Sequence, residues 1–322
     1  MAYYIGVDGG GTKTTYALFN EHKEILRMHE GPGTNHENLE GSFNEAAALL
    51  WEGLQALLDE AGLALSDIGF TLMGLAGVDH PYQYDALMKR LRGYGLERKA
   101  PQGKALRGLE ICNDGFIVVK AGCRSGAGIG LNLGTGTCCN AIDRRGRLRQ
   151  LAGLGDFSGD AGNGSWIAVQ AFRLVYDDVI LGLAATGLTP LLFEAFGLTR
   201  PEELLILIEA IEEPGSDAAK TLIRLFFEAA NRGDPAVLRL VEQMALRGAQ
   251  LIVAHLRNLD FAASLPCEVV LSGSIHTKLP NDIYIELLKQ KAAQLSGREL
   301  EFHKLEQPPV VGCINWILQE YA

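Results

Sequence analysis

The stretch Tyr4-Ile5-Gly6-Val7-Asp8-Gly9-Gly10-Gly11-Thr12-Lys13-Thr14-Thr15 decides the fold that this sequence predicts. An apolar run ends in an aspartate, and three glycines follow. Because glycine has no Cβ, such a chain can turn sharply and bring backbone N–H groups close to phosphate oxygens. The next residues, Tyr16-Ala17-Leu18-Phe19, are β-like and stop at Asn20-Glu21, which leaves no room for a helix. The stretch predicts a phosphate-binding β-hairpin; the alternative is a tight hairpin whose glycines serve geometry alone.

Two better-known phosphate loops do not fit this stretch. A Walker A loop needs Gly-Lys-Ser/Thr, and Lys13 comes one residue too late after Gly6 and Gly11. A Rossmann turn opens a helix, whereas here Thr14 replaces the third glycine and a strand follows. The hairpin therefore belongs to another class of phosphate loop.

A second stretch repeats the scheme of strand, polar residue and Gly/Thr-rich turn. It reads Gly128-Ile129-Gly130-Leu131-Asn132-Leu133-Gly134-Thr135-Gly136-Thr137, and an extended run resumes at Cys138-Cys139-Asn140-Ala141-Ile142. Two such hairpins in one chain indicate a duplicated α/β domain with a phosphate chain held between the copies.

This pair of hairpins resembles the two phosphate-binding hairpins of the ATPase superfamily that includes actin, hexokinase and the heat-shock chaperones. The rest of the chain resembles N-acetylglucosamine kinases of the BadF/BadG/BcrA/BcrD type. The resemblance implies an α/β fold of two ribonuclease H-like, actin-like ATPase domains with a cleft between them. The N-terminal domain would take residues 1–117 and 308–322, the C-terminal helix returning to it. The second domain would take residues 118–307, with a helical insertion at about 165–261.

Composition limits the partners of the chain. It has 322 residues, 48% of them hydrophobic, which is enough for a large core and suggests two domains. A net charge of −10 argues against a nucleic-acid partner. No secretory segment and no apolar run of membrane-spanning length is expected, so we predict a cytoplasmic protein with no membrane partner. Its six cysteines have no CxxC pattern and should be free thiols, with Cys138 and Cys139 on opposite strand faces.

Local patterns predict several further features. Glu24–Met28 should form a third strand, and Ser42 with Glu45 a capping box that opens a helix ending at Gly62. Arg144-Arg145-Gly146-Arg147 is most simply a solvated hairpin tip. Apolar residues of the helical insertion are expected to be core or dimer face, and they include Leu204, Leu205, Ile208 and Ile211.

Three loop residues are candidates for binding the sugar. Asn35 lies in a Gly/Pro turn, Gly77 follows the strand Gly69–Leu75, and Asp160 lies in a segment with five glycines in twelve residues; on sequence alone each is a plain loop residue. The resemblance implies that all three bind the substrate, with Asn35 and Asp160 contacting sugar hydroxyls. The chain departs from the family pattern at Ala76, Cys138 and Ala161, where relatives have serine, asparagine and glutamate, so recognition of the sugar 2-substituent does not transfer.

Asp114 follows the strand Leu109–Cys112 and precedes a helix. On position alone it could be a helix N-cap, a place where Asp is favoured. The resemblance implies that it is the catalytic base instead. It would then also contact the substrate.

The resemblance also implies the cofactors, ATP and Mg²⁺. Asp8 would hold the metal through water, and the adenosine motif would lie at Gly273 and Ser274. Phosphate oxygens would be bound by the hairpin residues Gly10, Gly11, Thr12, Gly134, Thr135 and Gly136. Lys13 would either neutralise phosphate charge or point to solvent.

The predicted function is therefore an ATP- and Mg²⁺-dependent kinase that phosphorylates the 6-hydroxyl of N-acetylglucosamine or a close relative such as N-acetylmuramic acid or glucosamine. A homodimer is expected. One alternative is an ATPase activator of a 2-hydroxyacyl-CoA dehydratase-type partner, with Cys123 as the cysteine that such a protein would place on an iron–sulfur cluster. Another is a nucleotide-binding structural or regulatory protein, although the chain has no matching appendage.

Overall fold

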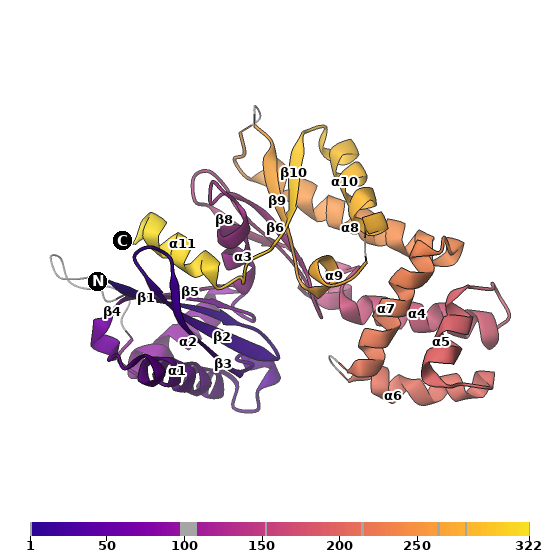
Figure 1. Ribbon diagram of the computed structural model, residues 1–322. Helices are drawn as coiled ribbons and strands as arrows, with labels where there is room; N and C mark the ends of the chain where they lie inside the picture. Colours follow the sequence, from indigo (N-terminus) through magenta and orange to yellow (C-terminus); the bar gives the residue numbers. More distant parts are fainter. Residues whose placement is uncertain are drawn as a thin grey trace. The chain divides into compact units, whose positions relative to one another are not determined.

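The computed structural model describes residues 2–96, 108–151, 153–213, 216–262, 265–280 and 282–321. The chain divides into two compact units. The first comprises Met1–Gly128, Asn140–Ile142 and Leu305–Ala322, and the second comprises Ile129–Cys139 and Asp143–Lys304. The predicted domain boundary at 117/118 falls inside helix α3 (Asp114–Gly122), all of which lies in the first unit. Each unit contains a five-stranded sheet (Figure 1).

The first sheet has the strand order β3-β2-β1-β4-β5. Its strands are β1 (Tyr3–Gly9), β2 (Lys13–Asn20), β3 (Ile25–Pro32), β4 (Ile68–Leu75) and β5 (Gly108–Cys112). The pair β1/β2 is antiparallel and pairs Asp8 with Thr15, which confirms the first predicted hairpin and, with β3, the predicted third strand. Strands β4 and β5 add in parallel, as expected for an α/β fold.

Helices cover both faces of this sheet (Figure 1). On one face lie α1 (Ser42–Ala61) and α2 (Pro81–Gly93), whose apolar sides bury a core that includes Ile5, Leu50 and Leu54. On the other face lie α3 and α11 (Val311–Glu320). Gly312 allows this second pair to touch, because a Cβ there would overlap the carbonyl of Ile117. The chain's last helix thus packs against β1 and α3 in the first unit.

The predicted capping box at Ser42 is wrong. Gly41 is the N-cap of α1, and Ser42 has a φ of +47°, outside the extended region that a capping residue needs. Half of the motif survives, since Glu45 Oε2 accepts the Gly41 N–H at 2.8 Å. The helix ends at Gly62 with a φ of +66°, as predicted.

The second sheet has the order β10-β9-β6-β7-β8. Its strands are β6 (Gly128–Leu133), β7 (Thr137–Ile142), β8 (Leu148–Leu151), β9 (Cys267–Ser272) and β10 (Leu300–Lys304). Neighbouring β6 and β7 form the second predicted hairpin. Within β7, Cys139 is buried and Cys138 is partly exposed, which agrees with opposite faces. None of the six cysteines, all of which lie within the described residues, forms a disulfide.

Helices α8 (Pro235–Asn258) and α10 (Asp282–Ser296) pack together in this unit. Gly248 of α8 brings that helix onto the sheet, because a Cβ there would lie 2.9 Å from Leu288 and 3.2 Å from Leu131. His255 Nε2 lies 3.0 Å from the Cys139 carbonyl oxygen, a second tie between α8 and the sheet. A short helix, α9 (Ser274–Thr277), follows β9.

The predicted helical insertion consists of α4 (Gly164–Val179), α5 (Leu188–Phe196), α6 (Leu207–Glu212), α7 (Asp217–Asn231) and α8. Within the insertion, a short 3-10 helix covers Pro201–Ile206. Outside it, further short 3-10 helices cover His36–Asn38, Leu65–Asp67 and Gly155–Ser158. A break between α7 and α8 was not predicted. It is organised by buried Asp234, which caps α8 through the Ala236 and Val237 N–H groups at 2.9 Å and accepts the Thr186 hydroxyl at 2.9 Å.

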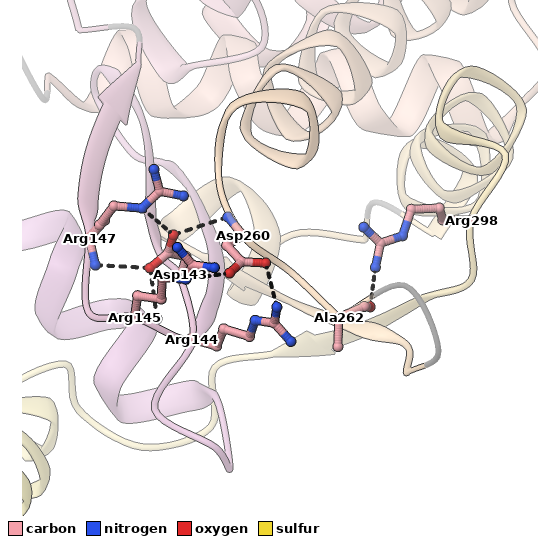
Figure 2. Close-up of polar contacts among 7 residues, drawn as sticks. All are labelled: Asp143, Arg144, Arg145, Arg147, Asp260, Ala262 and Arg298. Carbon is pink, nitrogen blue, oxygen red and sulfur yellow. Dashed lines mark hydrogen bonds and ion pairs between the residues drawn. The ribbon is translucent and has the colours of Figure 1, made fainter.

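The arginines after β7 are exposed at a hairpin tip, as predicted, and they are also paired with neighbouring carboxylates. Arg147 Nε lies 2.7 Å from an Asp143 carboxylate oxygen, and Arg144 and Arg145 lie 2.9 and 2.7 Å from the Asp260 carboxylate. These pairs are drawn in Figure 2. Asp143 also accepts the Asp260 N–H at 3.0 Å. Burial alone would raise the pKa of Asp143, but backbone N–H donors and Arg147 outweigh it and hold the pKa at about 2. The turn is therefore fixed to the segment that follows α8.

Within the described ranges, no helix combines the length and apolarity needed to cross a lipid bilayer.

Candidate active site

In the first unit, the loop after β3 is built onto the first hairpin. The turn closes with the Gly10 N–H donating to the Lys13 carbonyl at 2.9 Å. The Thr34 N–H then donates to the Gly10 carbonyl at 3.0 Å, and the Thr34 and Thr14 hydroxyls are 3.0 Å apart. Gly33 fits only because it lacks a Cβ, which would overlap the Gly11 carbonyl. These contacts carry Asn35 to the edge of the sheet where β1 ends.

Asn35 and Gly77 lie together at this edge. Asn35 Oδ1 accepts the Glu37 N–H at 3.0 Å. Gly77 has a φ of +80°, and a Cβ there would overlap Asn35 Oδ1, so both conformation and space require glycine. The Ala76 N–H donates to the Gly9 carbonyl at 2.8 Å and ties the end of β4 to the hairpin. The structure thus places two of the predicted sugar-binding residues side by side.

Asp114 is the first residue of α3, and its neighbour Asn113 is the N-cap. Asn113 Oδ1 accepts the Gly115 N–H at 2.9 Å, and its Nδ2 donates to Asp79 Oδ1 at 2.8 Å. The interpretation of Asp114 as the N-cap is therefore wrong by one residue. The cap of α3 is supplied by the Asn113 side chain and not by the Asp114 carboxylate.

Carboxylates gather where the parallel strands end. Asp8 pairs with Gly74 across β1/β4, and Gly74 pairs with Cys112 across β4/β5, two residues before Asp114. Burial raises the pKa of Asp8 to about 6, with Lys13 opposing the shift. Burial, and then the charges of Asp8 and Asp79, raise the pKa of Asp114 to about 7. A carboxylate with such a pKa can accept a proton near neutral pH, and the oxygen donors suit Mg²⁺.

Lys13 Nζ lies 2.6 Å from Glu30 Oε1 of β3, and both side chains are mostly exposed. The exposed side chain agrees with the alternative in which Lys13 points to solvent, although the pairing with Glu30 was not predicted. Its contact with phosphate stays a prediction.

In the second unit, helix α4 begins at the turn of the second hairpin. The Gly134 N–H donates to the Gly136 carbonyl at 3.1 Å, and the Gly164 N–H donates to the Gly134 carbonyl at 2.8 Å. Asn163 caps α4 through the Trp166 N–H at 2.8 Å and donates to the Thr137 hydroxyl at 3.1 Å. The positive end of the α4 dipole therefore faces the turn, an arrangement that favours an anion there.

The glycines of this second turn have no packing reason to be glycine. A Cβ at Gly134 or Gly136 would meet nothing within 4 Å, and neither has a left-handed φ. In the first hairpin, by contrast, a Cβ at Gly9 or Gly11 would lie 2.6 or 2.9 Å from a neighbouring side chain. Open space beside Gly134 and Gly136 is what a bound phosphate chain would need.

The turn after β9 reaches the same end of the second sheet. Gly273 has a φ of +86°, and a Cβ there would overlap the Leu133 carbonyl. Gly273 and Ser274 therefore lie next to the second hairpin. The structure brings together the predicted nucleoside and phosphate residues of this unit.

Asp160 is buried, and its carboxylate holds its own loop. It accepts the Gly153 and Gly155 N–H groups at 3.0 and 3.1 Å and the Ser158 hydroxyl at 2.6 Å. A sugar hydroxyl would have to share or replace these donors. Its role toward the sugar stays a prediction, as do the consequences of buried Ala161 and partly exposed Cys138.

Sequence reasoning missed the roles of Asp79 and Asn113. The available signals were the position of Asp79 at the end of a parallel strand and the preference for Asn at helix N-caps. The proposed cluster ligand Cys123 is buried as the C-cap of α3. Gly10 and Gly134 use their N–H groups inside the turns, which leaves Gly11, Thr12, Thr135 and Gly136 as the candidate donors to phosphate.

Comparison with known proteins identifies the relatives of the chain. The BadF/BadG/BcrA/BcrD ATPase family matches residues 5–297. An N-acetylmuramic acid/N-acetylglucosamine kinase from Clostridium acetobutylicum is 29% identical over 175 residues, which are 54% of this chain and 53% of that protein. The N-acetyl-D-glucosamine kinase of Dictyostelium discoideum is 26% identical over 239 residues, 72% of each protein. The matched part thus spans about half of the bacterial relative.

Solved structures share the fold. One assigned as an N-acetylglucosamine kinase from Chromobacterium violaceum has a TM-score of 0.68 at 23% identity and covers 99% of both chains. A ROK family glucokinase from Streptomyces griseus, solved with glucose and AMPPNP, has a TM-score of 0.56 at 15% identity and covers 98% of this chain and 97% of that one. The two-domain α/β fold predicted from the hairpins is confirmed.

Proposed function

Because the chain belongs to the BadF/BadG/BcrA/BcrD ATPase family, we propose that it is an ATP-dependent kinase of amino sugars. It transfers the γ-phosphoryl group to the 6-hydroxyl of N-acetylglucosamine or a close relative, such as N-acetylmuramic acid or glucosamine. The names of the two relatives described above give N-acetylglucosamine as a substrate of both and N-acetylmuramic acid as a second substrate of one. The observation that carries the proposal is the placement of Asp114, with its raised pKa, at the strand end that also holds Asp8, Asn35 and Gly77.

Asp114 is the base in this mechanism. Asn35, Gly77 and Asp160 bind the sugar and leave its 6-hydroxyl beside Asp114. The sugar oxygen bonds to the γ-phosphorus as the bond to the β-phosphate breaks, its proton passes to Asp114, and ADP leaves. With a pKa near neutrality, Asp114 can take this proton and release it to solvent afterwards.

The hairpins bind the phosphates. Gly11, Thr12, Thr135 and Gly136 donate hydrogen bonds, Gly10 and Gly134 shape the turns, and Lys13 supplies a mobile charge. Gly273 lets the backbone approach the nucleoside beside Ser274. Asp8 would hold Mg²⁺ through water, since carboxylate oxygens suit such a hard cation, and the bound ion would neutralise charge on the phosphates.

The organisation of the enzyme is part of the proposal. Two ATPase domains, which correspond to the two compact units of the chain, act together in a cytoplasmic homodimer. Exposed apolar side chains of the helical insertion supply a surface for the dimer contact, among them Leu205 at 49% and Ile206 at 74% exposure.

The ATPase-activator alternative is less favoured. An iron–sulfur cluster needs cysteines that reach a shared interface, and Cys123 is buried at the end of α3. A colourless purified protein with no iron would remove that alternative.

An ADP-release assay with ATP and Mg²⁺ tests the proposal against a panel of N-acetylglucosamine, N-acetylmuramic acid, glucosamine and glucose. We expect ADP release with at least one amino sugar to exceed the rate without sugar. Equal rates with every sugar would remove the kinase assignment.

A further inference from the structure

Phe157 is an apolar residue whose side chain lies in water in the ligand-free protein. It is 100% exposed at the tip of the segment Gly153–Gly159, and Leu154 in the same segment is 60% exposed. Burying a fully exposed phenylalanine side chain against a ligand raises the binding constant for that ligand by about 10- to 150-fold. If the segment closed over a ligand and buried this ring, the protein would bind that ligand more tightly.

The segment is folded around the Asp160 carboxylate. Both Gly153 and Gly155 donate their N–H groups to Oδ2, and Ser158 donates its hydroxyl to Oδ1. A sugar hydroxyl that bonds to Oδ2 competes with the two backbone donors. Sugar binding at Asp160 would therefore loosen the first half of the segment.

The backbone of the segment is suited to such a rearrangement. Gly153, Gly155 and Gly159 have φ values of +100°, +57° and +63°, and glycine moves between such conformations at little steric cost. The other half is fixed, because Arg247 of α8 donates to the Ser158 carbonyl. The segment thus has a hinge at Gly153–Gly155 and an anchor at Ser158, with Phe157 between them.

We propose that Gly153–Gly159 is a lid that lays the Phe157 ring against the apolar face of the acceptor sugar when Asp160 binds the sugar's hydroxyls. The inference rests on the proposed function, because it takes the sugar as the ligand of Asp160. A hexose offers hydroxyls at its rim and C–H groups on its face, which match one buried carboxylate beside an exposed aromatic ring. Phe157 is then a substrate-binding residue that also excludes water from the acceptor.

Limited proteolysis with chymotrypsin tests the lid in the intact wild-type protein. The enzyme cuts after exposed aromatic residues, so the bond between Phe157 and Ser158 should be cleaved without ligand, with the fragments identified by mass. A saturating concentration of the amino sugar that is phosphorylated should slow this cleavage about tenfold, the factor expected for covering the ring. A hexose that is not phosphorylated should not slow it.

Variants give a second readout. Phe157→Ala should raise KM for the sugar about tenfold and leave KM for ATP unchanged, and Phe157→Tyr should restore the sugar KM because the ring is kept. Leu265→Ala is the control, since it also removes an apolar side chain, one that is 66% exposed in this unit, and should change neither constant.

The outcomes separate the lid from the kinase. Unchanged cleavage at saturating sugar, in a protein that phosphorylates that sugar, overturns the lid and leaves the kinase intact. If the bond after Phe157 resists chymotrypsin without sugar, and the resistance grows with protein concentration, the lid proposal is also overturned. A second copy of the chain would then cover Phe157. If no sugar is phosphorylated, both proposals fall together.

Discussion

Asn113 Nδ2 donates a hydrogen bond to Asp79 Oδ1 at 2.8 Å, which holds a second carboxylate close to Asp114. After burial and the charge of Asp8, the charge of Asp79 is the next cause of the raised pKa of Asp114. The pair therefore tunes the group that we propose as the base.

Asp79→Asn should shift the pH dependence of the reaction. Removing the negative charge makes ionisation of Asp114 easier and lowers its pKa, so the acidic limb of a plot of kcat/KM against pH should move to lower pH. Asp85 is an exposed carboxylate on α2, away from the strand ends. Asp85→Asn removes the same charge there and should leave the acidic limb of the pH profile in place. An acidic limb at the wild-type pH in Asp79→Asn would contradict the coupling.

Asp114→Asn should separate activity from stability. As the proposed base, Asp114 contributes about 10²- to 10⁴-fold, so kcat should fall by that factor with little change in KM for ATP. A loss below about threefold, well short of that range, would contradict the assignment.

The stability of the same variant should change in the opposite direction. The folded protein keeps the Asp114 proton up to about pH 7, whereas the unfolded chain releases it near 3.8. The wild type therefore loses stability as the pH rises from about 3.8 to about 7, and the neutral amide escapes that loss. Melting curves should show Asp114→Asn several degrees more stable at pH 8, with a smaller gain at pH 5. An equal gain at both pH values would mean that the carboxyl is not perturbed.

Gly134→Ala should weaken ATP use without unfolding the protein. The added Cβ has no protein neighbour within 4 Å and the backbone needs no left-handed φ, so the melting temperature should stay the same. KM for ATP should rise about tenfold or more, because losing about 1.4 kcal/mol of phosphate binding corresponds to that factor.

Gly93→Ala is a matched control for this change. A Cβ at Gly93 is equally unobstructed, but the residue lies at the end of α2 in the first unit. It should alter neither the melting temperature nor KM for ATP. If Gly134→Ala behaves like Gly93→Ala, the second turn does not bind phosphate.

The parts of the fold that could be predicted are those specified by local sequence. The two hairpins followed from Gly-rich turns between apolar runs, and Gly62 marked a helix end because its left-handed φ favours glycine. The errors at Ser42 and Asp114 are shifts of one residue at helix starts. There the backbone conformation, rather than the residue type, decides whether Gly41 or Ser42, and Asn113 or Asp114, is the cap.

The rest depends on contacts between residues distant in sequence. The Asp143 carboxylate accepts the Asp260 N–H, and this bond fixes the arginine turn. The Asp234 carboxylate accepts the Thr186 hydroxyl, which ties α8 to the residues before α5. No local sequence pattern could have shown either contact. In the candidate site, the Asn113–Asp79 bond also joins residues distant in sequence. Residue types indicated where polar groups gather, and the packing determined which of them are already paired.

The position of the phosphate in the product tests the central claim most directly. After incubation of the protein with ATP, Mg²⁺ and the amino sugar that releases most ADP, phosphorus–proton correlation NMR of the product should connect the new phosphate to the two protons on carbon 6. A phosphate on another carbon, or ADP release without any sugar phosphate, would contradict the account.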